Sequence, residues 1–246
     1  MGVINLMPFK HEVEYQFSTI FQKIDKNIKL MYIYPATHKY KNIDITYLKN
    51  NYTPLNKINI NDYNGIIVTG APIEKYNFKE VDFWDEINTF FQNNTLPTIY
   101  ICWGSQGALY SKFGIEKFSL NKKLFGVYHH EIKINNPFIT TNFFAPHSRN
   151  TFNKKECILN ANLHIIGESK DAGVYMCSTK DFKNIFISGH SEYQKERLKF
   201  EFERDKQYIP ENYFINDNPE NDILFSWQNH QNEFYTNWIN FLRRFL

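Results

Sequence analysis

A short apolar run near the middle of the chain leads directly into a cysteine and a group of small residues. The run Thr98–Ile101 is rich in β-branched residues and predicts a buried strand, and the small residues at 104–107 allow a sharp turn into a helix. Cys102 lies at that corner, beside helix N-terminal amides whose positive field favours the nucleophilic thiolate. The pattern is that of a nucleophile elbow with sulfur in place of oxygen. A buried cysteine that only fills space is the alternative.

A second short apolar run carries a histidine and a glutamate just beyond its end. Residues 185–189 predict a strand that ends in glycine, and His190 and Glu192 follow it. The strand end can direct His190 towards Cys102, while Glu192 turns back to hold the imidazole. Nucleophile, base and orienting carboxylate are the groups that covalent acyl transfer requires. A surface His-x-Glu pair in a loop is the alternative, and its position after a second strand favours the triad.

Apolar periodicity along the chain indicates strands that alternate with helices. The expected strands are at 2–7, 28–34, 65–69, 98–101 and 185–189, and the expected helices at 11–24, 81–91, 194–204 and 233–245. This alternation predicts an α/β fold, with a mostly parallel sheet and helices on both faces. Shorter strand-like segments from 118 to 176 predict a short antiparallel extension. No repeat or flexible linker divides the chain, so residues 1–246 are expected to form a single acyltransferase domain.

Composition excludes several classes of protein. With 42% hydrophobic and 17% aromatic residues, the chain can bury a substantial core, and disorder is excluded. The 28 Lys and Arg residues nearly balance 26 Asp and Glu and are dispersed, so no nucleic-acid partner is expected. No apolar run is long enough to cross a bilayer, and the first residues lack the features of a signal peptide. We therefore expect no membrane partner.

Cysteine and histidine usage points to a reducing compartment and to chemistry without a metal. The three cysteines, Cys102, Cys157 and Cys177, predict reduced thiols and a cytoplasmic location. The adjacent pair His129 and His130 would face opposite ways on a strand and could not chelate together, so no metal site is expected.

Short motifs in a fixed order run through nearly the whole chain. They are Asn5-Leu6-Met7-Pro8 with Lys10, Thr69-Gly70-Ala71-Pro72, Cys102-Trp103, Lys123 with Gly126-Val127-Tyr128, Pro146-His147-Ser148-Arg149, Gly189-His190-Ser191-Glu192-Tyr193, Glu203-Arg204-Asp205 and Asn237-Trp238. Together they resemble the homoserine O-acyltransferases of methionine biosynthesis, of the homoserine trans-succinylase (O-succinyltransferase) type. The resemblance implies a class I glutamine-amidotransferase-like fold with Cys102, His190 and Glu192 as the triad. Ser191 stands where that family usually has proline.

The resemblance also implies roles for residues around the triad. The backbone amides of Trp103 and Ala71 would form the oxyanion hole. Arg204 would grip the carboxylate of an amino-acid acceptor. The further substrate-binding candidates are Lys123, Ser148 and Tyr193. Each role has a structural alternative. Gly70-Ala71-Pro72 could be an ordinary loop, and Arg204 a surface arginine paired with Glu201 or Asp205. Lys123 could be a solvated lysine and Ser148 a turn serine.

The resemblance further predicts which acyl group is used. In the family, the position two residues beyond the proline of Gly70-Ala71-Pro72 separates the donors: glycine leaves room for succinyl, whereas glutamate fills that space and repels the succinyl carboxylate. Glu74 occupies this position and predicts acetyl-CoA as co-substrate, because facing carboxylates in a closed pocket cost several kcal/mol. A Glu74 side chain that points to water is the alternative.

These inferences predict an O-acetyltransferase that moves an acetyl group from acetyl-CoA, through a Cys102 thioester, to the hydroxyl of L-homoserine. Serine as the acceptor and succinyl-CoA as the donor are close alternatives, because one methylene changes binding by only about 1–3 kcal/mol. A glutamine amidotransferase or hydrolase is a rival from another reaction class, and a non-catalytic binding protein is a third. Small-molecule substrates, no permanently bound cofactor and a homodimer are expected.

Overall fold

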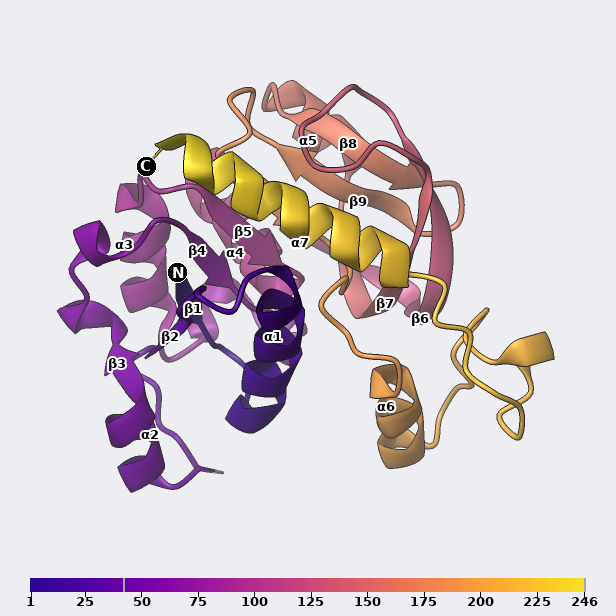
Figure 1. The fold of residues 1–246 in the computed structure, drawn as a ribbon, viewed down its shortest axis with the longest axis horizontal. Coiled ribbons are helices and arrows are strands. Elements are labelled where there is room, and N and C mark those ends of the chain that lie inside the picture. The colour runs from indigo at the N-terminus through magenta and orange to yellow at the C-terminus, as the bar shows by residue number, and fades with distance from the viewer. Residues whose placement is uncertain (42, 246) are drawn as a thin grey trace.

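Strands and helices alternate through the first half of the computed structural model, which describes residues 1–41 and 43–245. The strands are β1 (Gly2–Ile4), β2 (Met31–Tyr34), β3 (Tyr52–Pro54), β4 (Ile66–Val68), β5 (Thr98–Ile101), β6 (Lys117–Ile132), β7 (Phe143–Asn153), β8 (His164–Ser169), β9 (Gly173–Ser178) and β10 (Asn184–Ile187). The α-helices in Figure 1 are α1 (Lys10–Ile24), α2 (Ile45–Asn51), α3 (Trp84–Asn93), α4 (Trp103–Phe113), α5 (Lys155–Asn160), α6 (Arg197–Asp205) and α7 (Gln228–Leu242). Short 3-10 helices lie at Leu55–Lys57, Ile60–Asp62, Phe78–Glu80, Ile215–Asp217 and Arg243–Phe245.

One mixed sheet organises the molecule. Among the described residues its strand order is β3-β2-β1-β4-β5-β10-β9-β8-β6-β7. The pairs from β3 to β10 in this order are parallel, and the pairs from β10 to β7 are antiparallel. The predicted α/β fold, with its mostly parallel sheet and antiparallel extension, is confirmed.

Register brings the ends of three neighbouring strands to one edge of the sheet. Thr98 of β5 pairs with Ile66 of β4 on one side and with Asn184 of β10 on the other. The segments that follow β4, β5 and β10 therefore meet at the carboxyl edge, which is where open parallel sheets bind their ligands.

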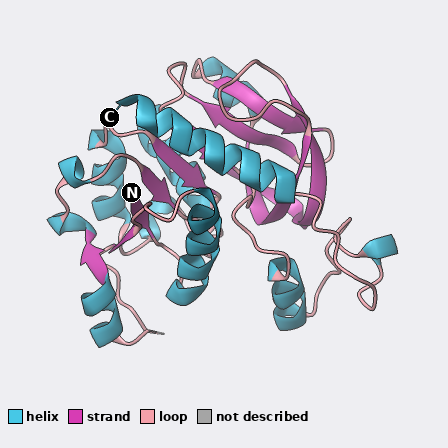
Figure 2. Ribbon diagram, in the orientation of Figure 1, coloured by secondary structure: helices cyan, strands magenta, loops and turns pink. Residues whose placement is uncertain are grey.

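Buried side chains alternate between the two faces of the parallel strands, and helices cover each face. Val3 and Ile99 belong to the apolar cluster that includes α1 and α7, which lie in front of the sheet in Figure 1. Their neighbours in sequence, Ile4 and Tyr100, belong to a second cluster with α3 and α4. Figure 2 shows this arrangement of helices around the strands. Both faces are covered, so these strands are apolar throughout rather than alternating.

Some element boundaries differ from the sequence predictions for local reasons. The first strand ends at Ile4 rather than at residue 7, because Leu6 N–H leaves the ladder to donate to Thr69 Oγ1 at 2.8 Å. The predicted helix at 194–204 begins at Arg197, after a turn closed by Arg197 N–H donating to Gln194 O at 3.1 Å. The last helix begins at Gln228, five residues earlier than predicted.

Residues 206–227, between α6 and α7, form an extended excursion at the lower right of Figure 1. Its base is anchored by a small aromatic cluster that includes Tyr193, Tyr213 and Trp227. In the part of the chain that the structure describes, no helix combines the length and the apolar character needed to cross a membrane.

Candidate active site

Cys102 occupies a strained turn between β5 and α4. Its backbone angles are φ 49° and ψ −114°, a conformation that residues other than glycine rarely adopt and that costs about 1–3 kcal/mol. Two backbone hydrogen bonds hold the turn: Cys102 N–H donates to Ile187 O at 2.7 Å, and Gln106 N–H donates to Cys102 O at 3.0 Å. The predicted elbow is present, and β10 fixes it from the side.

Two glycines allow the surrounding backbone to approach the elbow. A Cβ atom on Gly104 would lie 2.6 Å from Thr69 O, so only glycine lets the first turn of α4 pack against the end of β4. A Cβ atom on Gly70 would lie 3.1 Å from Cys102 Cβ and 3.8 Å from its sulfur. The backbone of the Gly70-Ala71-Pro72 turn thus runs directly beside the thiol.

His190 and Glu192 form a buried pair at the end of β10. His190 Nδ1 lies 2.7 Å from Glu192 Oε1, and each residue is 6% exposed, as is Cys102. Burial alone would lower the pKa of His190, but the negative charges of Glu192 and of the Cys102 thiolate outweigh it and raise this pKa to about 10. The arrangement favours the imidazolium form of His190.

Backbone donors are available where an oxyanion would form. Trp103 N–H is the first amide of α4, and helix N-terminal amides have no partner within the helix. Among the described residues, neither Trp103 N–H nor Ala71 N–H donates to another backbone group. Both residues adjoin Cys102, by sequence or through the Gly70 turn. Their amides are therefore available as oxyanion donors, the role that the family resemblance implies for them.

A cavity of about 420 Å³ opens onto the sulfur and brings most of the predicted site residues together. The predicted site residues that line it are Ala71, Glu74, Cys102, Lys123, Ser148, His190, Tyr193 and Arg204. Glu192 lies behind His190 and lines a separate small cavity on the α1 side. The Trp103 side chain is fully buried in the core, so only its backbone amide can take part.

Glu201 of α6 is a central residue that the sequence prediction missed. Its carboxylate accepts from Ser148 Oγ at 2.5 Å and from the Tyr193 hydroxyl at 2.9 Å, and lies 3.2 Å from Arg197 Nη2. Arg197 also forms an ion pair with Glu12 of α1. From the sequence, Glu201 was predicted only as a possible partner for a surface arginine. Its position three residues before Arg204, on one helix face, was the available signal.

Arg204 and Lys123 lie at the outer end of the cavity. Arg204 is 52% exposed at its side chain, and its Nε donates to Asp205 Oδ1 at 2.6 Å. Lys123 Nζ lies 3.5 Å from Asp205 and 3.9 Å from Glu201. The Asp205 pairing proposed as the structural alternative for Arg204 is thus present, and the guanidinium still borders the cavity.

Glu74 does not point to open water. Its carboxylate accepts from the backbone N–H of Asn150 at 2.9 Å, from Asn150 Nδ2 at 2.9 Å and from Thr151 Oγ1 at 2.9 Å. Gln106 of α4 in turn donates to Thr151 Oγ1 at 2.9 Å. The carboxylate is held by β7 on the wall of the cavity that contains Cys102.

A group of buried histidines lies behind the site without contacting the cavity. Arg149 Nε donates to His147 Nδ1 at 3.2 Å, and His147 Nε2 lies 3.1 Å from His130 Nε2. Burial lowers the pKa of His130 and of His230 to about 3, and lowers that of His147 well below its ordinary value. These histidines are neutral packing groups. Within residues 1–41 and 43–245, no three His, Cys, Asp or Glu side chains are placed to hold a metal ion together.

Known proteins similar in sequence are homoserine acyltransferases. The family described as homoserine O-succinyltransferase matches residues 1–244. Homoserine O-acetyltransferase 2 of Ilyobacter polytropus is 49% identical over 243 residues, covering 99% of this chain and 85% of that protein. Homoserine O-acetyltransferase of Clostridium acetobutylicum is 38% identical over 252 residues, covering 97% of this chain and 84% of that protein.

Solved structures with a similar fold include glutamine amidotransferases. The enzyme from Thermotoga maritima has a TM-score of 0.67 at 14% identity and covers 98% of this chain and 96% of its own. The one from Methylobacillus flagellatus has a TM-score of 0.63 at 11% identity, covering 92% and 88%. At this identity the likeness concerns the fold alone, and it confirms the predicted glutamine-amidotransferase-like architecture. Because the family match spans nearly the whole chain, the chain belongs to the homoserine O-succinyltransferase family of O-acyltransferases.

Proposed function

We propose that this protein transfers an acetyl group from acetyl-CoA to the side-chain hydroxyl of L-homoserine, through a thioester on Cys102. The observation that carries the proposal is the buried group of Cys102, His190 and Glu192, of which Cys102 and His190 line the cavity. Family membership supports the acyl-transfer chemistry, and the relatives named homoserine O-acetyltransferase support the acceptor and the donor.

In the first half-reaction, the Cys102 thiolate attacks the carbonyl carbon of the acetyl thioester. The Trp103 and Ala71 amides stabilise the oxyanion that develops on the carbonyl oxygen. The bond from this carbon to the CoA sulfur then breaks, and the His190 imidazolium gives its proton to the departing thiolate. Acetyl-Cys102 and free CoA are the products. Glu192 keeps the imidazole in the orientation that both proton transfers need.

In the second half-reaction, the acceptor hydroxyl attacks acetyl-Cys102. Neutral His190 takes the hydroxyl proton as general base, the carbon–sulfur bond breaks, and the ester leaves with Cys102 again a thiolate. Arg204 and Lys123 would bind the acceptor carboxylate, and Ser148 would line the same end of the cavity. Carboxylate binding would release Arg204 from Asp205, its partner in this structure.

Glu74 supports acetyl-CoA as the donor. Its carboxylate is fixed on the cavity wall by three donors from Asn150 and Thr151, so it cannot easily swing away from an entering acyl group. A succinyl carboxylate would meet this negative charge inside the cavity, at a cost of several kcal/mol. An acetyl group carries no such charge.

Mass spectrometry of the peptide that contains Cys102 tests the proposal directly. The protein is incubated with acetyl-CoA or succinyl-CoA without an acceptor, and then with homoserine, serine or glutamine. We expect acetylation of Cys102 by acetyl-CoA and loss of the label on addition of homoserine. A Cys102→Ala variant should take no label. Cys177→Ala is the matched control, because burial raises the pKa of the Cys177 thiol to about 12 and keeps it inert. If neither donor labels Cys102, the proposed transferase activity is refuted. It is also refuted if the protein only hydrolyses glutamine.

A further inference from the structure

Tyr193 lies flat against the imidazole of His190. The two ring centroids are 4.3 Å apart and the ring planes differ by only 13°. Both residues are almost fully buried, and a turn joins them, in which Tyr193 N–H donates to His190 O at 3.2 Å. Because the rings are parallel and in contact, the imidazole cannot rotate out of its plane without displacing the tyrosine.

The hydrogen bond to Glu192 does not by itself provide this restraint. It fixes Nδ1 of His190 at one point, 2.7 Å from Oε1, and leaves the ring free to swing about that point. The distal Nε2 atom must face both the sulfur and the substrate for the proton transfers proposed above. A second contact, on the face of the ring, is therefore needed to define the direction of Nε2.

The tyrosine ring is itself held from two directions. Its hydroxyl donates to Glu201 Oε1 at 2.9 Å. Burial and the Glu201 charge raise the pKa of Tyr193 well above its ordinary value, so the phenol stays protonated and remains the donor. On the backbone side, Tyr193 O accepts from Trp227 Nε1, just before α7, at 2.9 Å and from Gln231 Nε2 of α7 at 3.1 Å.

The same helix also holds the residue between the base and its carboxylate. Gln231 Nε2 donates to Ser191 O at 2.7 Å. Ser191 lacks the ring by which a proline would restrict the backbone. The hydrogen bond from Gln231 therefore helps to fix the turn from His190 to Glu192. The orientation of the imidazole thus depends on α7 and α6, two helices outside the strand edge.

We infer that Tyr193 is a positioning residue for His190, acting as a stacking platform for the imidazole rather than as a contact for the acceptor. The face of an aromatic ring also attracts a cation, so the platform stabilises the imidazolium form. This inference rests on the proposed function, because it assigns Tyr193 to the proton transfers of that reaction. It predicts an effect on both half-reactions, whereas an acceptor contact would affect only the second.

The test compares Tyr193→Leu with Tyr193→Phe, which keeps the ring and loses only the hydroxyl bond. We expect Tyr193→Leu to slow acetylation of Cys102, in the absence of acceptor, by about 30-fold, the size of a cation–π contact in a desolvated site. The KM for homoserine should stay within about twofold of the wild-type value, since no acceptor contact is lost. Tyr193→Phe should acetylate within about threefold of wild type, because it retains the stack.

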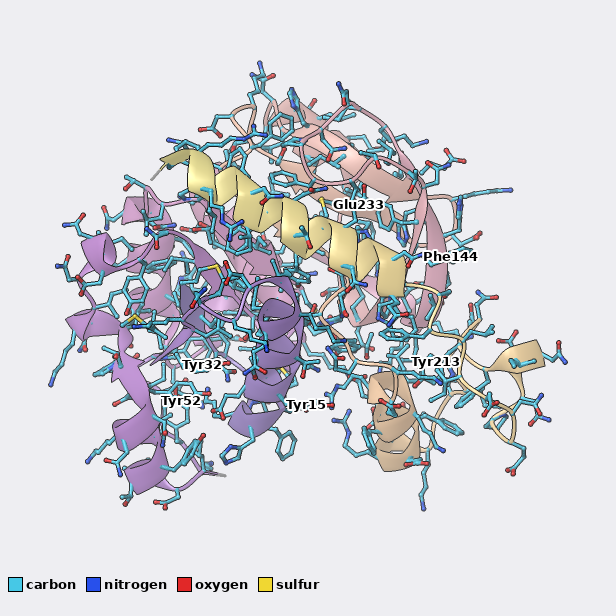
Figure 3. All side chains as sticks on the ribbon, in the orientation of Figure 1. Tyr15, Tyr32, Tyr52, Phe144, Tyr213 and Glu233 are labelled. Atoms are coloured by element: carbon cyan, nitrogen blue, oxygen red, sulfur yellow. The ribbon has the colours of Figure 1, made fainter. Side chains whose placement is uncertain are left out.

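Tyr213→Leu is the matched control for general loss of packing. Tyr213, labelled in Figure 3, is a fully buried tyrosine of the same aromatic cluster, and its hydroxyl donates to Lys195 O at 2.6 Å. It does not contact the imidazole ring. Equal slowing in Tyr213→Leu would overturn the inference. So would normal acetylation of Tyr193→Leu combined with a raised KM for homoserine, since that result would make Tyr193 an acceptor contact.

Two measurements test the stacking of Tyr193 on His190 without using the acyl donor. The rate at which iodoacetate alkylates Cys102 should fall at lower pH in Tyr193→Leu than in wild type, on the alkaline side of its pH profile, because this anionic reagent reacts faster beside an imidazolium and the imidazolium is less stable in the variant. In the wild-type protein, NMR should show the His190 Hε1 signal displaced upfield by the stacked ring, with assignment from His190→Gln. An undisplaced signal would refute the stack even if Tyr193→Leu does not fold. Failure of wild-type acetylation would refute the proposed function and leave both of these measurements valid.

Discussion

The inner end of the cavity and its outer rim differ in how their charges are held. At the inner end, Cys102, His190 and Glu192 are each 6% exposed and lie at the ends of β5 and β10. At the rim, Arg204 is 52% exposed and Lys123 is 17% exposed at their side chains, and both contact Asp205. The charged groups at the inner end are buried and have few, fixed partners. The charged groups at the rim pair with Asp205 and are also in contact with water.

The difference in burial between the inner end and the rim determines which chemistry each region can perform. Charges in a dry, rigid site interact strongly and can shift proton equilibria, whereas half-exposed charges are screened and contribute modestly. Changes at the inner end should therefore impair both half-reactions, whereas changes at the rim should alter the choice or affinity of one substrate. Glu74 lies between the two regions, partly buried and fixed on β7.

The largest effect is expected for Glu192→Gln. Removing the charge that stabilises the imidazolium should lower the rate of Cys102 acetylation by about 10³-fold or more, as loss of the third triad member does elsewhere. The KM for homoserine should change little. Single-turnover labelling with acetyl-CoA measures the effect. Glu203→Gln, on the exposed side of α6, is the control and should retain activity. Equal loss in the control would remove the distinction between the inner end and the surface.

A smaller effect is expected for Glu74→Gly. Removing both the charge and the volume should raise kcat/KM for succinyl-CoA by about 10–100-fold, consistent with a like-charge cost of a few kcal/mol. Steady-state rates with the two donors measure it. Glu74→Gln keeps the volume and removes only the charge, so an intermediate gain in that variant separates repulsion from crowding. If neither variant gains succinyl-CoA activity, Glu74 does not determine the donor.

The effect expected for Arg204→Lys is smaller than that for Glu74→Gly. Replacing the bidentate guanidinium with a point charge should raise the KM for homoserine by about tenfold, because a charged hydrogen bond contributes about 1.5–3 kcal/mol and this site is half exposed. Acetylation of Cys102 without acceptor should remain at the wild-type rate. Arg243→Lys is the control, because Arg243 is an exposed arginine far from Arg204 in the sequence. Slower acetylation in Arg204→Lys would mean that the rim is not independent of the inner end.

The pH dependence of stability should differ between the two sides of the profile. The pKa of His190 is raised to about 10, so its contribution is complete below about pH 6.5 and is lost as pH rises towards 10. The pKa of His230 is lowered to about 3, so protonation of the unfolded chain removes stability as pH falls below about 6.5. Each group contributes a slope of at most about 1.4 kcal/mol per pH unit.

Denaturant unfolding across this pH range checks both signs. His230→Phe, which can keep the stack on Phe143, should flatten the acidic side of the profile, and His190→Gln should flatten the alkaline side. His129→Asn, at an exposed position on β6, is the control. If His230→Phe leaves the acidic slope unchanged, other groups account for the loss of stability in acid.

Much of the inner end could be predicted from local sequence. The apolar runs at 98–101 and 185–187 could be assigned as strands, and residues that follow parallel strands meet at one edge of a sheet. Cys102 and His190 could therefore be placed near one another, whereas the amides of Trp103 and Ala71 were implied by the family resemblance. The role of Glu201 could not be predicted, because it depends on α6 packing beside Ser148 of β7, 53 residues away in sequence.

The α/β class, the elbow at Cys102 and the proximity of His190 could be predicted from local sequence, because hydrophobic periodicity and small residues act over a few positions of the chain. By contrast, long-range packing fixes Glu74 on β7 rather than leaving it free in water, and it places Tyr193 under the imidazole with Gln231 holding the turn. These contacts join residues far apart in the chain. Their geometry follows from the packing of whole helices against the sheet, which no local pattern records.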